Sequence, residues 1–593
     1  MTLQKEDKSA YEAFLKKHKI ILMFFILLFI CLSLRLFYLQ IIKGGSYEKV
    51  SQQQRMHSTY ERAPRGVIYS ADNIVLADNE FTYAALFYPF GQQQTPTNES
   101  IKELNKILGR DVKISADKCY RYGRFVKLAD NITMEEMFKI QEKKSILKNI
   151  SIVRETRRIY CYPEAVSHII GYTGEISVDE IEKWSEQERK IGDYVGRGGI
   201  EQSYDVYLQG KDGGWQVEVN AKGYRIKAFK YVPPQAGSNV YSTVDLKLQK
   251  AAYDALKSSS TGRGAVVVLD TRTGAVKALV SCPGFDANKA GAKDFGRYLK
   301  DKNLPLFNRS LQAVYPPGSV FKIITFAAAV ELLNIDSEKT VRCTGSFELG
   351  NRHYSCWYKP GHGAVNLISA LARSCNVYFY QLGLKLGIGN LEKYARKFYF
   401  GQKTDIDLPN EKKGFVPSPE WKKSKLKMPW LYGDTVIFAI GQGALLVTPI
   451  QMAYVISAVA NRGVCRKPYI VDRIVDFNGN EVYKHALEFG GRIDLSDKTW
   501  NLLYKALLET VESGAGIRSK ISGVKIAGKT GTVQNPHGSD HAWFVSYAPA
   551  DAPEIAIAVV VENGGGGGLN AVPISRKIYE TYFNIESEKE ERQ

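Results

Sequence analysis

The 593-residue sequence lacks three features that would assign it to well-defined classes of protein. It has no internal repeats, which excludes a solenoid or a propeller built from stacked units. It has no second apolar run of membrane-spanning length after residue 42, so we expect at most one membrane helix. Its net charge of +18 comes from scattered Lys and Arg residues without a nucleic-acid-binding motif, so we expect no nucleic-acid partner.

One long apolar run is present, over residues 20–42, and Arg35 is its single charged residue. It is long enough for a membrane helix, and no small-residue cleavage site follows it, which favours a retained anchor over a cleaved signal peptide. Five basic residues precede the run: Lys5, Lys8, Lys16, Lys17 and Lys19. They predict that residues 1–19 lie in the cytoplasm and that the chain after residue 42 lies outside the membrane.

The length of the chain after the anchor predicts at least two folded domains. Residues 43–240 mix short strands and helices with charged loops and contain no catalytic constellation. Over residues 241–585, strand-like runs at both ends flank helical segments, which predicts an α+β domain with one sheet assembled from distant segments. We expect strand pairs at 264–270 with 275–280 and at 542–548 with 555–562, a closing helix at 573–583, and a charged, unstructured tail at 586–593.

A serine lies three residues before a lysine in Ser319-Val-Phe-Lys322. The preceding Tyr315-Pro-Pro-Gly318 cannot continue a helix, whereas residues 320–333 are apolar and compatible with one. Ser319 is therefore expected at a helix start, with the Lys322 amine on the same face and able to take the hydroxyl proton. Free backbone N–H groups at that position favour a developing anion.

Two further motifs follow in the chain, Ser374-Cys-Asn376 and Lys529-Thr-Gly-Thr532. The first is expected on a turn between two helical stretches, which places a hydroxyl and an amide there. The second is expected at the end of a strand, where Gly531 allows a peptide backbone to approach closely. Lys529 and the hydroxyl of Thr530 or Thr532 suit a ligand that ends in a carboxylate.

In this order and spacing, the three motifs resemble those of the penicillin-binding and serine β-lactamase superfamily. Other segments resemble class B penicillin-binding proteins. They are residues 62–69, 158–163 with His168, 196–201, 243–245, Asn308-Arg309, 441–443, 541–544 and 561–564. Two of them, 541–544 and 561–564, resemble the elongation type related to penicillin-binding protein 2. Roles in elongation, division and sporulation all stay open. The resemblance covers most of the chain. It implies a single membrane helix, an elongated non-catalytic pedestal of the dimerisation type over 43–240, and a transpeptidase domain over 241–585.

The resemblance also implies an activity, namely D,D-transpeptidation of peptidoglycan stem peptides through an acyl-enzyme on Ser319. Lys322 would be the general base, Ser374 a proton relay, and Asn376 a ligand of the peptide amide. Lys529, Thr530 and Thr532 would hold the terminal carboxylate, and the backbone N–H groups of Ser319 and Thr532 would form the oxyanion hole. β-Lactams would acylate Ser319, and no cofactor would be needed for catalysis.

The resemblance places the protein in the bacterial cytoplasmic membrane, with its catalytic domain outside the cell. A multi-spanning glycan polymerase is the expected partner. Three alternatives belong to other classes: a β-lactamase, a β-lactam-sensing receptor and a non-catalytic scaffold of a wall-synthesis complex. A β-lactamase would need neither the pedestal nor the anchor, and a receptor would carry several membrane helices.

Three of the eight cysteines lie close together in the sequence with one histidine: Cys343, Cys356, His362 and Cys375. Three interpretations compete, namely buried free thiols, a Cys343–Cys356 disulfide, and a structural zinc site with three thiolates and one imidazole. The spacing is looser than in a typical zinc knuckle. Some elongation-type class B proteins resemble this arrangement, with a metal site between the first two motifs.

Overall fold

The computed structural model describes residues 3–45, 47, 56–58, 61–87, 95–112, 126–187, 189, 193–219, 225–290, 295–535 and 538–585. The expected tail at 586–593 lies outside these residues. The chain forms two compact units. Unit 1 comprises residues 1–63, 81–156 and 211–235, and unit 2 comprises residues 64–80, 157–210 and 236–593. The expected pedestal over 43–240 contributes to both units, because residues 64–80, 157–210 and 236–240 belong to the same unit as the C-terminal part.

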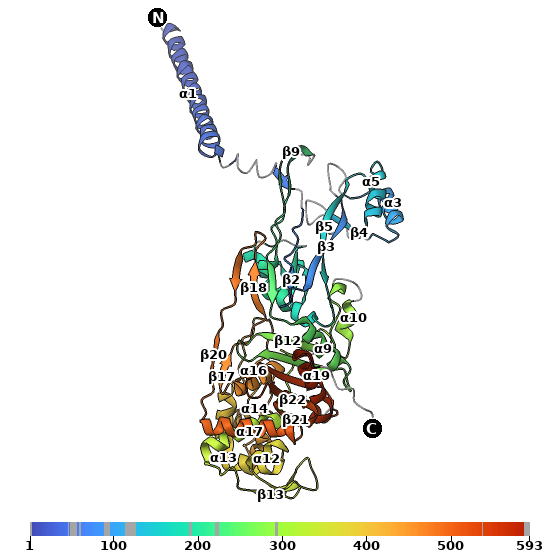
Figure 1. The fold of residues 1–593 in the computed structure, drawn as a ribbon. Helices are drawn as coiled ribbons and strands as arrows, with labels where there is room; N and C mark the ends of the chain where they lie inside the picture. The colour runs from blue at the N-terminus through green and yellow to red at the C-terminus, as the bar shows by residue number, and fades with distance from the viewer. Residues whose placement is uncertain are drawn as a thin grey trace. The chain divides into compact units, whose positions relative to one another are not determined.

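Unit 1 begins with the long helix α1 (Leu3–Phe37), which a π-helical turn extends through Tyr38–Ile42 (Figure 1). The span Phe14–Ile42 is long and apolar enough to cross a membrane, and its side chains are exposed. Burial of a fully apolar helix requires an apolar medium, because all its faces are hydrophobic. The predicted apolar segment is therefore one continuous helix, as a single-pass anchor requires.

The folded part of unit 1 contains two small assemblies. One is an antiparallel sheet of β1 (Met56–Ser58), β8 (Gly214–Val219) and β9 (Arg225–Val232). In the other, β4 (Val126–Ile132) pairs with the second half of β3 (Val75–Phe87), and Leu104, Ile132 and Ile140 belong to its core. Its helices are α3 (Asn98–Leu108) and α5 (Met134–Glu142). Thr97 and Thr133 cap these helices by accepting backbone N–H groups of the first turn.

Unit 2 is built on a five-stranded antiparallel sheet in the order β12-β11-β23-β22-β21. The strands are β11 (Gly264–Asp270), β12 (Val276–Cys282), β21 (Ala527–Val533), β22 (His541–Ala548) and β23 (Ile555–Val561). Both predicted strand pairs are confirmed, and so is the assembly of one sheet from the two ends of the predicted domain. β21 is an edge strand, so one row of its backbone groups is not paired with β22.

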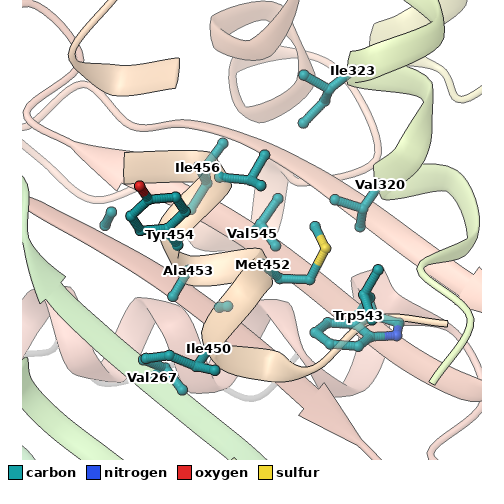
Figure 2. Packing of buried hydrophobic residues seen from close by; sticks show 14 of the residues in the cluster. Val267, Val320, Ile323, Ile450, Met452, Ala453, Tyr454, Ile456, Trp543 and Val545 are labelled. Carbon is teal, nitrogen blue, oxygen red and sulfur yellow. The ribbon is translucent and has the colours of Figure 1, made fainter. Parts of the chain in front are cut away.

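Both faces of this sheet are covered by helices, which explains why its strands are continuously apolar. Along β11, Val266 packs into the cluster with α9 (Leu246–Lys257) and α19 (Val572–Tyr582). The next residue, Val267, packs into the cluster with α11 (Lys322–Leu333) and α16 (Pro449–Ala460). Side chains of α16 lie over sheet residues in Figure 2. Because successive strand residues point to opposite faces, each face receives every second side chain.

A helical layer surrounds α11. It consists of α12 (Leu367–Ala372), α13 (Asn376–Lys397), α14 (Pro419–Leu426), α15 (Tyr432–Ala439) and α17 (Asp497–Glu512). Short strand pairs lie between α11 and α12: β13 (Val341–Cys343) with β16 (Gly363–Val365), and β14 (Ser346–Leu349) with β15 (Arg352–Ser355). The predicted turn between two helices is present and carries Ser374, whereas Asn376, expected on the same turn, is the first residue of α13.

The N-terminal segments of unit 2 form short elements around a buried ion network. β2 (Ile68–Tyr69) pairs in parallel with β10 (Asn239–Ser242), and β6 (Tyr172–Glu175) pairs with β7 (Tyr194–Arg197). The completely buried Glu201 on α7 (Gly199–Ser203) accepts hydrogen bonds from Arg65 at 2.5 Å and from Arg158 at 2.7 Å.

Candidate active site

Ser319 lies on a single 3-10 turn, Gly318–Phe321, that leads directly into α11. This confirms the predicted helix start. Gly318 has φ of +56°, and a Cβ there would lie 2.5 Å from Val533 Cγ2, so only glycine allows the turn to approach β21 this closely. The Gly318 N–H donates to the Gly441 carbonyl, which fixes the residue before the serine.

The Lys322 side chain is completely buried at the start of α11. Its Nζ donates to the Ser374 carbonyl at 2.8 Å and to Asn376 Oδ1 at 2.7 Å, and lies 3.3 Å from Ser374 Oγ. Burial lowers the pKa of Lys322 to about 8, because an ammonium loses its hydration there. Ser319 and Lys322 make no side-chain hydrogen bond to each other, although the helix places them one turn apart.

Ser374 connects the two lysines. It adopts φ of +57° on the turn between α12 and α13, a conformation that costs a non-glycine residue ~1–3 kcal/mol and is maintained by surrounding contacts. Its Oγ accepts a hydrogen bond from Lys529 Nζ at 2.9 Å and lies 3.3 Å from Lys322 Nζ. A hydroxyl that accepts from two amines retains its own O–H as a donor.

Lys529 on β21 is also completely buried, and its Nζ donates to the Thr530 carbonyl at 2.8 Å. Burial lowers the pKa of Lys529 well below its usual range, and the nearby Lys322 lowers it further. The amine is therefore not open to solvent, as direct binding of a ligand carboxylate would require. Thr532 is the exposed residue of this motif, and Thr530 is largely buried.

Gly531 lies in close contact with other parts of the protein itself. A Cβ at this position would lie 2.9 Å from Trp543 Cβ, 3.0 Å from Val320 Cγ2 and 3.3 Å from the Pro317 carbonyl. The glycine therefore lets β21 pack against the turn that carries Ser319. That Gly531 also lets a substrate backbone approach β21 closely stays a prediction.

Side chains to which the sequence analysis gave no structural role hold the loop before Ser319. The Trp543 indole N–H donates to the Pro316 carbonyl at 3.2 Å, and the Tyr315 hydroxyl donates to Glu562 at 2.7 Å. Arg309 donates to the same carboxylate at 3.1 Å. These partners come from β22 and from the end of β23, and no local sequence pattern links them to residues 315–318.

The predicted metal ligands converge beside the Ser374 turn. One ligand atom from each of Cys343, Cys356, His362 and Cys375 lies within 4.8 Å of all the others. His362 Nδ1 is 3.7 Å from Cys343 Sγ and 3.5 Å from Cys356 Sγ. All three thiols are buried and free, so the Cys343–Cys356 disulfide is not formed. Cys375 is also the residue before α13, between Ser374 and Asn376.

These residues fit a tetrahedral zinc ion. Zn–S bonds of about 2.3 Å and a Zn–N bond of about 2.05 Å at tetrahedral angles place sulfur and nitrogen about 3.6 Å apart. The two observed sulfur–nitrogen distances lie on either side of that value. A hydrogen bond between Cys375 and Cys356 lowers the pKa of Cys356 and raises that of Cys375, so this pair favours one thiolate, on Cys356. Three soft thiolates and one imidazole form a donor set that zinc prefers.

Comparison with known protein families matches two regions of the chain. A model of the penicillin-binding protein transpeptidase domain covers residues 264–580, which is more than half of the chain. A model of the penicillin-binding protein dimerisation domain covers residues 60–242. The chain belongs to the penicillin-binding protein transpeptidase family.

Relatives that match nearly the whole chain indicate which type of penicillin-binding protein it resembles. Peptidoglycan D,D-transpeptidase MrdA of Acinetobacter baumannii is 32% identical over 94% of this chain and 86% of the relative. MrdA of Escherichia coli K12 is also 32% identical, over 90% and 88%. Stage V sporulation protein D of Bacillus subtilis is 28% identical over 94% and 84%. The chain thus resembles class B penicillin-binding proteins of the penicillin-binding protein 2 type.

Solved structures agree with this family. The complex of penicillin-binding protein 2 with MreC from Helicobacter pylori gives a TM-score of 0.75 at 28% identity, over 89% of this chain and 100% of that one. Penicillin-binding protein 2 of Pseudomonas aeruginosa in complex with WCK 5153 gives 0.65 at 28%, over 91% and 100%. The predicted α+β fold with a dimerisation domain and a transpeptidase domain is confirmed.

Proposed function

We propose that this protein is a serine-type peptidoglycan D,D-transpeptidase that uses Ser319 as its nucleophile. The observation that carries the proposal is the buried chain Lys322–Ser374–Lys529 next to the serine turn. The MrdA relatives support this activity and favour none of the three alternatives. A hydrolase role or antibiotic resistance draws no comparable support from the relatives.

The acylation step follows from these positions. The neutral Lys322 amine accepts the Ser319 hydroxyl proton while Oγ bonds to the penultimate D-alanyl carbonyl carbon. The developing oxyanion is bound by the backbone N–H groups of Ser319 and Thr532. The C–N bond to the terminal D-alanine then breaks, and the Ser374 hydroxyl passes a proton to the leaving amine. Ser374 regains a proton from a neighbouring lysine.

Substrate binding uses the edge of β21 and the side chain of Asn376. The exposed Thr532 and the neighbouring Thr530 bind the terminal carboxylate, and Lys529 adds positive potential from beneath the strand. An incoming carboxylate raises the pKa of Lys529 and favours its protonated form, while repulsion between the two amines keeps Lys322 neutral. An amine of a neighbouring stem peptide then attacks the ester, which forms the cross-link and releases Ser319.

A direct assay tests this function. Detergent-solubilised protein is incubated with a stem pentapeptide ending in D-alanyl-D-alanine and with an acceptor amine. We expect one D-alanine released per cross-linked product, measured by mass spectrometry, and neither product from Ser319→Ala. Cross-linked product from Ser319→Ala would contradict the assignment, and rapid turnover of a β-lactam would indicate a β-lactamase.

We further propose that Cys343, Cys356, His362 and Cys375 bind a structural zinc ion. With four protein ligands the site has no open position for water, so the ion would supply cross-linking and no catalytic chemistry. Cys375 would tie the metal site to the turn that holds Ser374 in its unfavourable conformation. The ion would thereby stabilise the second motif.

We propose that α1 anchors the protein in the cytoplasmic membrane, with unit 2 on the outer side. The five lysines before the apolar segment support this orientation through the positive-inside rule. One similar solved structure is the complex of penicillin-binding protein 2 with MreC. Another is a peptidoglycan synthase complex that coordinates polymerization and crosslinking. A membrane-embedded glycan polymerase is therefore the partner we propose, and mild-detergent co-purification tests the pairing.

A further inference from the structure

Unit 2 contains a cavity of about 310 Å³ that shares no lining residue with the three catalytic motifs. This volume lies at the lower end of the range for small-ligand sites, ~300–1,000 Å³. His168, the segment 196–199 and Asn308 line it. All three belong to segments that resemble the family in sequence but take no part in the proposed reaction. They lie far apart in the sequence and meet only in the fold.

The amide side chains of this cavity are oriented by the protein. Asn308 Oδ1 accepts from the Ser310 N–H at 3.1 Å, and Gln312 Oε1 accepts from the Asn308 N–H at 3.0 Å. At the mouth, Gln202 Oε1 accepts from the Gly198 N–H at 2.9 Å. Because each oxygen is occupied, each NH₂ group is left as a donor, and none of the three has a partner among the described residues.

The remaining lining residues are neutral or internally paired. Among the described residues no Asp or Glu lines the cavity, and the one guanidinium, that of Arg197, is paired with both oxygens of Glu180 at 2.7 Å. His168 Nε2 is buried without a hydrogen-bond partner in the described part of the chain. Apolar and aromatic side chains form the other walls: Tyr172, Trp184, Phe285, Leu306, Leu311 and Leu408.

We propose that this cavity binds an N-acetylated amino sugar of the glycan strand whose stem peptides are being cross-linked, an inference that rests on the proposed function. The acetamido carbonyl and the ring oxygens supply acceptors for the amide donors. The C–H face of a pyranose packs on aromatic side chains such as Trp184 and Tyr172. A neutral sugar also matches a cavity that offers no unpaired charge.

Saturation-transfer NMR tests the proposal on the full chain in detergent, with triacetylchitotriose as the probe. The protein is first acylated with a β-lactam, so that the active site is closed and any transfer comes from elsewhere. Gln312→Glu and Asn308→Asp keep the oxygen that accepts the backbone N–H but replace the NH₂ donor by an oxygen. Gln402→Glu, at an exposed amide outside the cavity, is the matched control.

We expect saturation transfer from the protein to the sugar with the wild type and with Gln402→Glu. With Gln312→Glu and Asn308→Asp we expect at least tenfold weaker sugar binding at an unchanged melting temperature. Absence of transfer with the wild type, or equal transfer with all variants, would overturn the proposal. Transfer to a stem tetrapeptide in place of the sugar would also overturn it. Sugar binding by a chain that takes up no β-lactam would refute the proposed function and leave the cavity assignment standing.

Discussion

Unit 2 buries two clusters of charged side chains, and they differ in whether the charged groups are paired with groups of opposite charge. In the first, Glu201 lies between Arg65 and Arg158, and Arg65 also contacts Asp205 at 2.6 Å. Burial lowers the pKa of Arg65, but the two carboxylates outweigh it and raise the pKa above the usual range. For Glu201, the two guanidinium groups outweigh burial and lower the pKa.

In the second cluster, Lys322 and Lys529 share Ser374, and no carboxylate is bonded to either amine. For Lys322 burial outweighs the opposing effect of Cys375 and Cys356, and for Lys529 burial and Lys322 act together, so the pKa of each lysine is lowered and more of each amine is neutral near pH 7, the form that can accept a proton. Within one unit, buried charged groups therefore serve two purposes, namely stabilising the fold and transferring protons. Paired buried charges fix the chain, whereas unpaired buried amines give up their protons near neutral pH.

The largest expected effect comes from Lys322→Met, which replaces the amine by an apolar side chain of similar length. We expect β-lactam acylation to slow by ~10²–10⁴, because the general base is lost. Removing an uncompensated buried amine should raise the free energy of unfolding at pH 7 by up to about 3 kcal/mol. The gain should disappear as pH rises from about 8 to about 10.4, the unfolded pKa, since wild-type Lys322 is then neutral in both states. Stopped-flow kinetics measure the acylation rate, and urea unfolding measures the stability. A Lys322→Met variant that is less stable than the wild type and is still acylated at the wild-type rate would contradict the contrast between the two clusters.

Glu201→Gln should have the opposite effects from Lys322→Met: it should lower the free energy of unfolding and leave the acylation rate nearly unchanged. Leaving two buried guanidinium groups without their carboxylate costs about 3–5 kcal/mol. Because the folded pKa of Glu201 is lowered, its stabilisation is present at neutral pH and is lost as pH falls below about 4. Below the melting temperature we expect acylation within about threefold of the wild type. Glu135→Gln, in the exposed pair with Lys139, is the control and should leave the melting temperature almost unchanged.

Removal of the proposed zinc should affect both properties moderately. A strong chelator or Cys343→Ser should lower the melting temperature and slow acylation, because the Ser374 turn loses its tie to Cys375. Elemental analysis of protein purified without a polyhistidine tag should give close to one zinc per chain. A metal content near zero, or a chelator without effect on melting, would eliminate the site, whereas Cys465→Ser, at a buried cysteine outside the cluster, should leave the metal content unchanged.

The pH profile of acylation gives a smaller effect, of about tenfold per pH unit below the pKa of Lys322. The neutral amine is the active form, so the rate should rise with pH and level off above about 8. A rate that stays constant from pH 6 to 9 would argue against Lys322 as the base. Asn376→Ala should lower the rate least, because it removes a positioning contact and keeps the base.

The sheet, the helix start at Ser319 and the turn at Ser374 could all be predicted from local sequence. Continuous apolar strands, Pro-Pro-Gly before an apolar helix, and two flanking helical stretches are short-range signals. The convergence of the four metal ligands was predictable only as one of three alternatives, because spacing does not specify which side chains meet.

Other features depend on long-range packing, which no local pattern reveals. Trp543 and Glu562 reach the serine loop from strands more than 200 residues away in the sequence. The close approach of Gly531 to Pro317 and Val320 likewise has no local sequence signal. The division of the pedestal between two units likewise depends on which segments pack together.

We expect the buried lysines to make Ser319 the reactive group of this protein. Intact-mass measurement after incubation with a β-lactam, followed by peptide mapping, tests it most directly. We predict one adduct per chain, on the peptide that contains Ser319, and no adduct with Ser319→Ala at an unchanged melting temperature. An adduct on another residue, or one that persists in Ser319→Ala, would contradict the account.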